Sequence, residues 1–420
     1  MKSIYLTLAV TIILLSGCDQ KEEVNQFTSE QDTLVLTTVK QMGNGLFSSG
    51  AGSLYFQDTT ERYLYPIVFP NDIDEIRLAL RFIDLKVWQF NRYKKGESEL
   101  KYLLDDIANG DLDTLNCPTT EQNYINIMTG YKDSVSVFIV DENNNKDFRD
   151  DSVRVYQELN WRSTENLIKF TYEIFDGQSI VKDSSWINIG TLGGSDLWSY
   201  ISQYFTADLS IDDQSYQIGI SDEQSGFTYD LAPRIALLSE NGISKDTLLK
   251  SEVMYLDEYI KLGNTYYRFD RITNSGKYVT LIKENDFEDL EGTQVGMLAP
   301  GFTFKSYAGD TIHSTALHDK PLLIANISGC TSRSFSVYTE MSKRYADKLF
   351  VLGLTPHITE DFGGTLADTE DPVNKGIYDI YRHAYSSYTC YLIGTNNRII
   401  DKFDVFKWEA HLSKYFGEDE

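Results

Sequence analysis

The residues best suited to chemistry in this chain surround Cys330. The preceding run 322–325 is apolar without alternation, which is typical of a central strand covered on both faces. After Cys330, apolar residues recur at three- and four-residue spacing, which predicts an amphipathic helix: Phe335, Tyr338, Met341 and Tyr345. Cys330 therefore falls where a strand turns into a helix. Unpaired backbone N–H groups and the positive end of the helix dipole stabilise a thiolate at such a position, and the thiolate is the reactive form.

The segments around this turn are predicted to alternate between strands and helices. Apolar runs predict strands at 349–354, 389–393 and 398–403. Helical patterns cover 373–385 and 408–416. Strands that alternate with helices favour an α/β sandwich for this part of the chain.

At this point the residues resemble a known family. The markers are Ala299-Pro300, Phe302, Gly309-Asp310, the strand into Cys330, and Tyr391-Leu-Ile before Asn397-Arg-Ile-Ile. Together they resemble the TlpA-type redoxins, envelope thiol–disulfide oxidoreductases of the thioredoxin superfamily. The resemblance implies a thioredoxin-like domain at 295–420, with Cys330 as nucleophilic thiolate and no cofactor.

Three positions depart from the family pattern of Trp-Cys-x-x-Cys and a cis-proline. Gly329 stands in place of the tryptophan, Arg333 in place of the second cysteine, and Tyr388 in place of the cis-proline. A peroxiredoxin-type site fits less well, because Leu323 and Ile327 stand where that site carries Pro and Thr.

Cys390 lies two residues past the cis-proline position, which the resemblance places beside the active-site cysteine. Three interpretations stay open: a non-standard Cys330–Cys390 pair, a solitary reactive Cys330, or an inert remnant. A disulfide requires Cα atoms within about 7 Å, which the sequence does not establish. Buried free cysteines often act as small apolar residues, and that is the simple alternative for Cys390. The cation of Arg333, one turn on, would lower the pKa of the Cys330 thiol.

The N-terminus predicts export. A charged start, an apolar run at 4–15 and a small-residue ending form a signal peptide over residues 1–17. The sequence Leu15-Ser-Gly-Cys18 resembles a bacterial lipobox, which implies lipidation of Cys18 and a membrane anchor. An acidic tether follows at 18–32. Its Gln20-Lys-Glu-Glu23 resembles the surface-export signal of Bacteroidota lipoproteins, so we expect an outer-membrane, surface-exposed protein, with the periplasmic face as the alternative.

Charge excludes some classes of partner. The chain has 63 Asp and Glu against 38 Lys and Arg, a formal net charge of −25, which disfavours nucleic acid. The expected partners are the membrane, through the lipid anchor, and protein thiols or disulfides. Beyond Cys18 only three cysteines remain, too few for a disulfide scaffold.

Residues 33–291 are predicted to be β-rich, as one or two modules, which makes the chain an α+β protein in two parts. Alternating strands joined by polar turns predict hairpins at 134–156, 216–238 and 265–282. Helices are expected at 97–109, before Gly110, and at 197–204, where Ser195 or Asp196 would cap the helix.

The turn that begins at Asp141 is a weak calcium candidate. Its Asp141, Asn143, Asn145 and Asp147 place oxygen ligands at alternate positions, as an EF-hand loop does. However, Lys146 replaces the glycine and Ser152 the bidentate glutamate of such a loop. A polar hairpin turn is the favoured interpretation, and no other metal site is expected.

Two functions follow from these patterns. In the first, the protein is an anchored extracytoplasmic thiol–disulfide oxidoreductase that uses Cys330, Arg333 and Cys390. In the second, the thioredoxin-like fold has lost its chemistry and serves as a binding or structural domain of the envelope.

Overall fold

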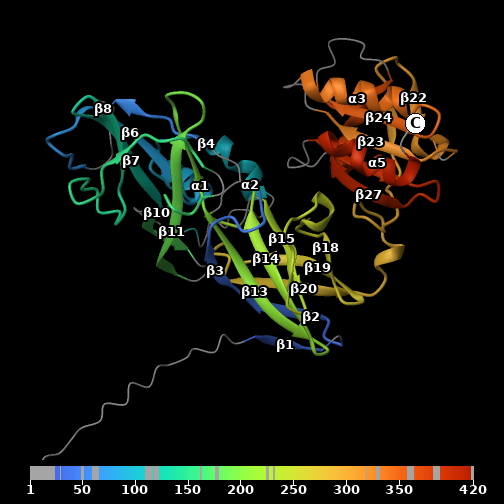
Figure 1. Ribbon diagram of the computed structural model, residues 1–420, viewed down its shortest axis with the longest axis horizontal. Helices are drawn as coiled ribbons and strands as arrows, with labels where there is room; N and C mark the ends of the chain where they lie inside the picture. The colour runs from blue at the N-terminus through green and yellow to red at the C-terminus, as the bar shows by residue number, and fades with distance from the viewer. Residues whose placement is uncertain are drawn as a thin grey trace, which may run out of the picture.

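The computed structural model describes residues 24–28, 30–48, 52–58, 66–108, 117, 123–160, 163–175, 179–223, 227–229, 232–317, 319–327, 332–356, 364–381 and 388–417. Two β-sandwiches and a thioredoxin-like domain follow one another across the molecule (Figure 1). Within the described ranges, no helix combines the length and apolar character needed to cross a membrane.

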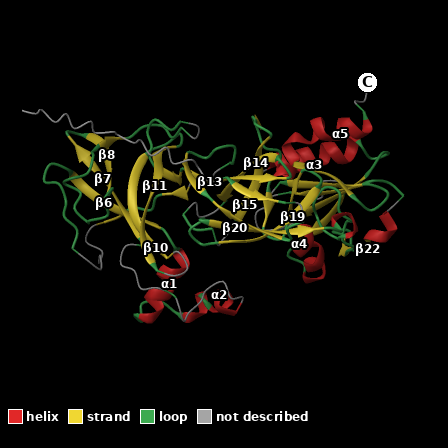
Figure 2. Cartoon of the chain, turned by 90° about the horizontal axis from the view of Figure 1, so that it is seen from below, coloured by secondary structure: helices red, strands yellow, loops and turns green. Residues whose placement is uncertain are grey.

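The first sandwich packs two antiparallel sheets face to face. One sheet has the order β5 (Gln57–Asp58), β6 (Asp74–Phe82), β7 (Tyr124–Lys132), β8 (Val135–Val140), β9 (Arg154–Val155). The other has the order β10 (Ile168–Phe175), β11 (Ile180–Thr191), β12 (Leu197–Ile201), β4 (Gly52–Ser53). Both contribute alternate residues to one core, for example Ile127 and Phe138 from the first sheet and Phe170 and Ile189 from the second. Helices α1 (Leu85–Lys94) and α2 (Leu104–Ala108) lie beside this sandwich (Figure 2).

The second sandwich is built from a seven-stranded and a four-stranded sheet. The larger sheet contains β1 (Asn25–Phe27), β3 (Val39–Met42), β13 (Gln203–Ile211), β14 (Gln214–Asp222), β15 (Pro233–Glu240), β16 (Ile243–Ser244) and β17 (Met254–Tyr255). The smaller has the order β18 (Tyr259–Leu262), β19 (Thr265–Ile272), β20 (Tyr278–Glu284), β2 (Thr33–Thr37). Their inner faces share a core that includes Leu209, Ile218, Tyr267 and Leu281.

The third part is a five-stranded mixed sheet with helices on both faces. Its order is β25 (Thr365–Asp368), β24 (Phe350–Thr355), β23 (Leu322–Asn326), β26 (Thr389–Ile393), β27 (Ile399–Asp404). The first three strands are parallel, and β26 and β27 are antiparallel to their neighbours. Helices α3 (Ser332–Arg344) and α5 (Trp408–Phe416) pack on one face, and α4 (Lys375–Tyr381) with the hairpin β21 (Thr303–Lys305)–β22 (Thr311–His313) lies on the other. This is a thioredoxin-like domain, as the sequence predicts.

Charged contacts join the thioredoxin-like domain to the second sandwich. Lys402 Nζ of β27 lies 3.0 Å from Glu258 Oε1, and both side chains are largely buried. Arg398 donates to the backbone oxygens of Glu288 and Gly296, at 2.6 and 2.8 Å, in the segment between the two parts. These contacts fix the β27 side of the domain against the sandwich.

The predicted hairpins are confirmed, since β8 pairs with β9, β14 with β15, and β19 with β20, all antiparallel. The helix expected at 197–204 is wrong, because Leu197–Ile201 is strand β12 and pairs with β11 and β4. The helix at 97–109 is replaced by a 3₁₀ turn at Leu100–Tyr102 and the short α2. The helix at 373–385 is a 3₁₀ turn, Pro372–Asn374, followed by α4, and residues 382–387 lie outside the described part.

Helix α1 was not predicted, although its start carries a recognisable signal. Asp84 Oδ1 accepts a hydrogen bond from Val87 N at 3.0 Å, which is an N-cap contact. Arg92 and Lys94 in the last turn complement the helix dipole.

Gly353 in β24 provides a test of the packing under α3. A Cβ at this position would lie 2.6 Å from Leu366 Cδ2, 2.8 Å from Ile327 Cδ1 and 2.9 Å from Tyr338 Cε2. Gly353→Ala is therefore expected to lower the free energy of unfolding by about 1–3 kcal/mol, measured by urea denaturation.

Gly376→Ala is the matched control, because a Cβ there meets nothing within 4 Å and the residue lies in α4. It is expected to raise stability by up to about 1 kcal/mol, through helix propensity. Equal stabilities of the two variants would show that the sheet tolerates the added methyl group.

Candidate functional site

The residues on both sides of Cys330 are described. The last described residue before it, Ile327, donates its N–H to Leu354 O at 2.8 Å, and α3 begins at Ser332. Residues 328–331, Cys330 among them, lie outside the described part, as does Cys18. Cys330 therefore falls between the central strand β23 and helix α3, as the sequence predicts, while the geometry around its thiol stays a prediction.

Arg333 lies in the first turn of α3. Its guanidinium packs 4.8 Å from the centroid of the Phe406 ring, a cation–π contact. The Phe406 ring in turn lies 5.1 Å from that of Tyr388. Arg333, Phe406 and Tyr388 thus form a continuous set of contacts beside the start of α3.

Tyr388 occupies the position at which the resembling family has its cis-proline. It has a φ of +67°, which is uncommon for a residue with a large side chain. Its carbonyl oxygen accepts a hydrogen bond from Val405 N at 2.7 Å. The residue that precedes β26 therefore has a left-handed backbone conformation.

Cys390 is a fully buried free thiol on β26. It pairs with Ala325 on β23 and Phe403 on β27, and its side chain belongs to the core under α3 and α5. Burial raises the pKa of the Cys390 thiol far above its ordinary value; the charge of Lys250 partly offsets this, and the nearby Asp404 adds to it. The structure therefore favours the simple alternative, a small core residue, and a Cys330–Cys390 pair stays untested.

In the Asp141 loop, the two buried oxygens of Asp141 are occupied by the loop itself. Oδ1 accepts from Asn145 N, and Oδ2 accepts from Lys146 N and from Asn126 Nδ2. Asn143 Oδ1 also accepts from Asn145 N.

Asp147 forms an ion pair with Arg149, with Nη2 2.6 Å from Oδ2. Lys146 adopts the left-handed conformation, with φ +68°, that glycine usually provides. The carboxylates of Asp141 and Asp147 thus stabilise the turn between β8 and β9, which fits the favoured polar hairpin, and calcium binding stays an untested prediction.

Asp151 of this loop is expected to make stability depend on pH. Burial, and then the charges of Asp141, Asp150 and Glu142, raise the pKa of Asp151 from 3.8 to about 7, although its Oδ1 accepts from Glu142 N at 3.0 Å. Because the folded-state pKa is the higher one, the protonated form favours folding: this contribution is full below pH 3.8 and is lost as pH rises through about 7. Asp151→Asn should gain about 1–2 kcal/mol of stability at pH 8, allowing for solvent screening, and nothing at pH 4.

The stability of each protein is measured by urea denaturation at pH 4 and pH 8, with Asp147→Asn as the contrasting variant. Arg149 lowers the pKa of Asp147 to about 2, so replacing the Asp147 carboxylate by an amide brings no gain in stability at pH 8. Identical pH profiles for wild type and Asp151→Asn would contradict a raised pKa at Asp151.

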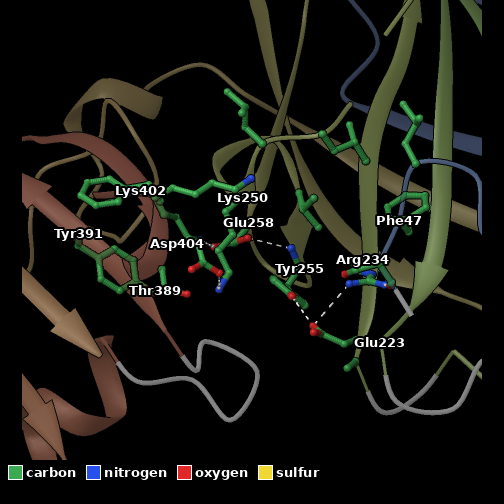
Figure 3. A pocket seen from close by; sticks show the side chains of 18 of the residues that line it. Phe47, Glu223, Arg234, Lys250, Tyr255, Glu258, Thr389, Tyr391, Lys402 and Asp404 are labelled. Carbon is green, nitrogen blue, oxygen red and sulfur yellow. Dashed lines mark hydrogen bonds and ion pairs between the residues drawn. The ribbon is translucent and has the colours of Figure 1, made fainter. Parts of the chain in front are cut away.

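A cavity of about 480 Å³ lies between the second sandwich and the thioredoxin-like domain. Figure 3 shows Thr389, Tyr391 and Asp404 on one side, Phe47, Glu223 and Arg234 on the other, and Lys250, Tyr255 and Glu258 between them. Apolar side chains complete the wall: Leu46, Leu248, Leu249, Val253, Leu256 and Phe403. A concave apolar site with a few convergent polar groups is the usual form of a small-molecule pocket.

Three acid–base pairs line this cavity. Lys402 and Glu258 are 3.0 Å apart, Arg234 and Glu223 3.7 Å, and Lys250 and Asp404 3.8 Å. Tyr255 Oη donates to Glu223 Oε2 at 2.5 Å.

The pKa of Lys250 is lowered chiefly by burial, with Asp404 acting in the opposite direction. The sequence did not predict this cavity. Its lining residues come from separate segments between residues 46 and 411, and no regular spacing relates them.

Searches against family models and against curated proteins returned no match. Among solved structures, the thioredoxin domain of a thiol-disulfide oxidoreductase from Bacteroides vulgatus is 13% identical with a TM-score of 0.25, covering 29% of this chain and 96% of that one. A thiol:disulfide interchange protein from a Bacteroides species is 11% identical, with a TM-score of 0.24 and coverages of 29% and 90%. The exposed lipoprotein thioredoxin of Streptococcus pneumoniae is 14% identical, with a TM-score of 0.22 and coverages of 27% and 99%. Because these identities and TM-scores are low, the assignment of a thioredoxin-like domain rests on the sheet order and the helix positions given above.

Proposed function

We propose that this chain is a membrane-anchored, extracytoplasmic thiol–disulfide oxidoreductase in which Cys330 acts as a single nucleophilic thiolate. The observation that supports it most is the place of Cys330 in the chain, between the central strand β23 and the start of α3 in a thioredoxin-like sheet. A thiol at the start of a 13-residue helix is exposed to its unpaired N–H groups and dipole, which lower a thiol pKa.

The proposed reaction is thiol–disulfide exchange. The Cys330 thiolate attacks one sulfur of a substrate disulfide, a mixed disulfide forms, and the other sulfur leaves as a thiolate. An external thiol then attacks the mixed disulfide and releases the second half of the substrate as a thiolate, which leaves the external thiol bound to Cys330. A second external thiol attacks that bond and releases Cys330, so the two external thiols leave as a disulfide and supply the two electrons. Cys390 takes no part in this version, because burial keeps its thiol protonated.

The proposal includes lipidation of Cys18 and an outer-membrane location, with the protein at the cell surface and the periplasmic face as the alternative. Strand β1, seven residues after Cys18, lies at the bottom of the second sandwich, and the thioredoxin-like domain lies above and to the right (Figure 1). An anchor before β1 would thus hold the thioredoxin-like domain away from the membrane.

A redox-inactive binding domain is the second candidate. It is favoured by the contacts among Arg333, Phe406 and Tyr388, because Arg333 and Tyr388 stand where the resembling family carries its second cysteine and cis-proline. In that case the thioredoxin-like domain would have a structural role, through its contacts with the second sandwich.

Turnover of a disulfide separates the two candidates. The purified chain, supplied with dithiothreitol, is expected to accelerate reduction of a fluorescent glutathione mixed disulfide in proportion to protein concentration. A rate equal to that of dithiothreitol alone would support the binding domain.

A further inference from the structure

The cavity between the second sandwich and the thioredoxin-like domain has the composition of a small-molecule site. Its volume of about 480 Å³ is within the usual range of such pockets. Apolar residues from both parts form its walls, with Phe47, Leu249 and Leu256 from the sandwich side and Phe403 from β27. A ligand that fills it therefore needs an apolar body.

The formal charges around the cavity cancel. The lining carries four cations and three carboxylates: Arg234, Lys250, Lys402 and Lys407 against Glu223, Glu258 and Asp404. His411 of the lining, counted as neutral, holds a fourth carboxylate behind the wall, since its Nδ1 lies 2.9 Å from Asp401 Oδ2. Lys407 is exposed, so water solvates its charge. A ligand with a net charge would therefore bring an uncompensated charge into a partly desolvated site, which is unfavourable.

The carboxylates of the lining already accept hydrogen bonds from the protein. Glu258 accepts from Lys402 Nζ at 3.0 Å and from Tyr255 N at 2.8 Å. Glu223 accepts from Tyr255 Oη at 2.5 Å, and Asp404 accepts from the backbone N–H two residues further on, at 3.0 Å. These acceptors do not depend on a donor from a ligand.

Arg234 of β15 is the contrasting case, because most of its donors are unused. Its side chain is 4% exposed, and of its five N–H donors one, on Nη2, donates to the described residues, at Ser48 O. Its Nε has no hydrogen-bond partner, and Nη1 lies 3.7 Å from Glu223 Oε2, longer than a hydrogen bond. The guanidinium carbon lies 5.3 Å from the centroid of the Phe47 ring. Because unused donors on a buried guanidinium are unfavourable, the site favours a ligand oxygen that accepts from Arg234.

Glu223 decides which kind of oxygen fits there. Figure 3 shows the Arg234 guanidinium facing the Glu223 carboxylate on one side of the cavity. A ligand carboxylate at Arg234 would be repelled by Glu223, and a ligand ammonium at Glu223 would be repelled by Arg234. An uncharged carbonyl oxygen accepts from the guanidinium without either repulsion.

We propose that this cavity binds an uncharged, largely apolar carbonyl compound, such as a ketone or an ester, whose oxygen accepts a hydrogen bond from Arg234. The apolar body of the ligand packs against Phe47, Leu249 and Phe403. These contacts do not use the Cys330 thiol, so the ligand site is separate from the proposed exchange reaction.

The test is equilibrium dialysis of the full chain against benzophenone, with two analogues in parallel. Diphenylmethane keeps both rings but lacks the carbonyl oxygen, and 4-benzoylbenzoate keeps the carbonyl but adds a carboxylate. Benzophenone is expected to bind with a Kd below about 0.2 mM, and each analogue at least about ten-fold more weakly.

Photo-cross-linking locates the bound molecule. On irradiation, the benzophenone carbonyl takes a hydrogen atom from a neighbouring C–H group and the two carbons then bond, so mass spectrometry identifies the labelled peptide. Labelling is expected on the peptides that contain Phe47, Leu249 or Phe403.

Three variants assign the interaction. Arg234→Met should remove the preference for benzophenone over diphenylmethane, because it removes the donor and keeps an apolar side chain. Lys407→Met is the matched control, at an exposed cation of the same lining, and should keep that preference. Cys330→Ser should bind as wild type does, which separates this test from that of the oxidoreductase.

The inference fails if wild type shows no binding of benzophenone up to about 0.2 mM. It also fails if either analogue binds as tightly as benzophenone, or if the label lies outside the three expected peptides. Because these comparisons use wild-type protein, they hold even if a variant is unstable.

Discussion

Lys402→Met is expected to lower the free energy of unfolding by about 3–5 kcal/mol, because it leaves the carboxylate of Glu258 buried without its cation. Burial alone would lower the pKa of Lys402, but the charge of Glu258 and its hydrogen bond outweigh this, so the pKa is raised and the lysine is charged. Glu258 also accepts from Tyr255 N at 2.8 Å, which fixes its place in the sandwich. The loss of stability should shift the urea unfolding transition of the thioredoxin-like domain to lower urea concentration. The fluorescence of Trp408, which is buried in this domain, follows that transition.

The double variant Lys402→Met/Glu258→Gln separates the ion pair from simple packing. The glutamine keeps an acceptor for Tyr255 N but carries no charge, so the double variant should recover much of the stability lost in the single one. Lys375→Met removes an exposed lysine paired at i,i+4 and should change stability by less than about 0.5 kcal/mol. If Lys402→Met is as stable as that control, the buried pair does not hold the two parts together.

Cys330→Ser is expected to reduce disulfide turnover at least 100-fold, on the order of what loss of a nucleophile causes. Serine keeps the size of the side chain, but its hydroxyl remains protonated at neutral pH, so no exchange with a disulfide takes place. The measurement is the dithiothreitol-driven reduction rate at saturating substrate, with unfolding monitored in parallel.

Cys390→Ala is the matched control for that experiment. Because Cys390 is buried with a raised pKa, the variant should retain turnover within about two-fold, while the lost packing in the core lowers stability. Loss of turnover in both variants, with both folded, would instead support the Cys330–Cys390 pair.

Parts of the fold that the sequence predicts well are those with long periodic signals. The continuous apolar run 322–325 predicts a central strand, and β23 lies in the middle of its sheet. The spacing of Phe335, Tyr338 and Met341 likewise predicts α3, and all three pack in one core. Such patterns reflect burial on one or both faces, which is a local property.

The failures arise where tertiary pairing overrides local signals. Residues 197–204 follow a plausible helix cap, yet β12 gains hydrogen bonds on both sides, from β11 and β4, that a helix could not make. The site shows the same limit. The sequence identifies Cys330 and Arg333 by position, but the burial of Cys390 and the interdomain cavity depend on segments that meet only in the folded chain.

The measurement that tests the central claim most directly is the pH dependence of Cys330 alkylation in the folded chain, followed by mass spectrometry of its peptide. A reactive thiolate predicts a midpoint well below the ordinary thiol pKa of about 8.5, with Cys390 unlabelled until the protein unfolds. A Cys330 midpoint at or above that value would contradict the proposed oxidoreductase.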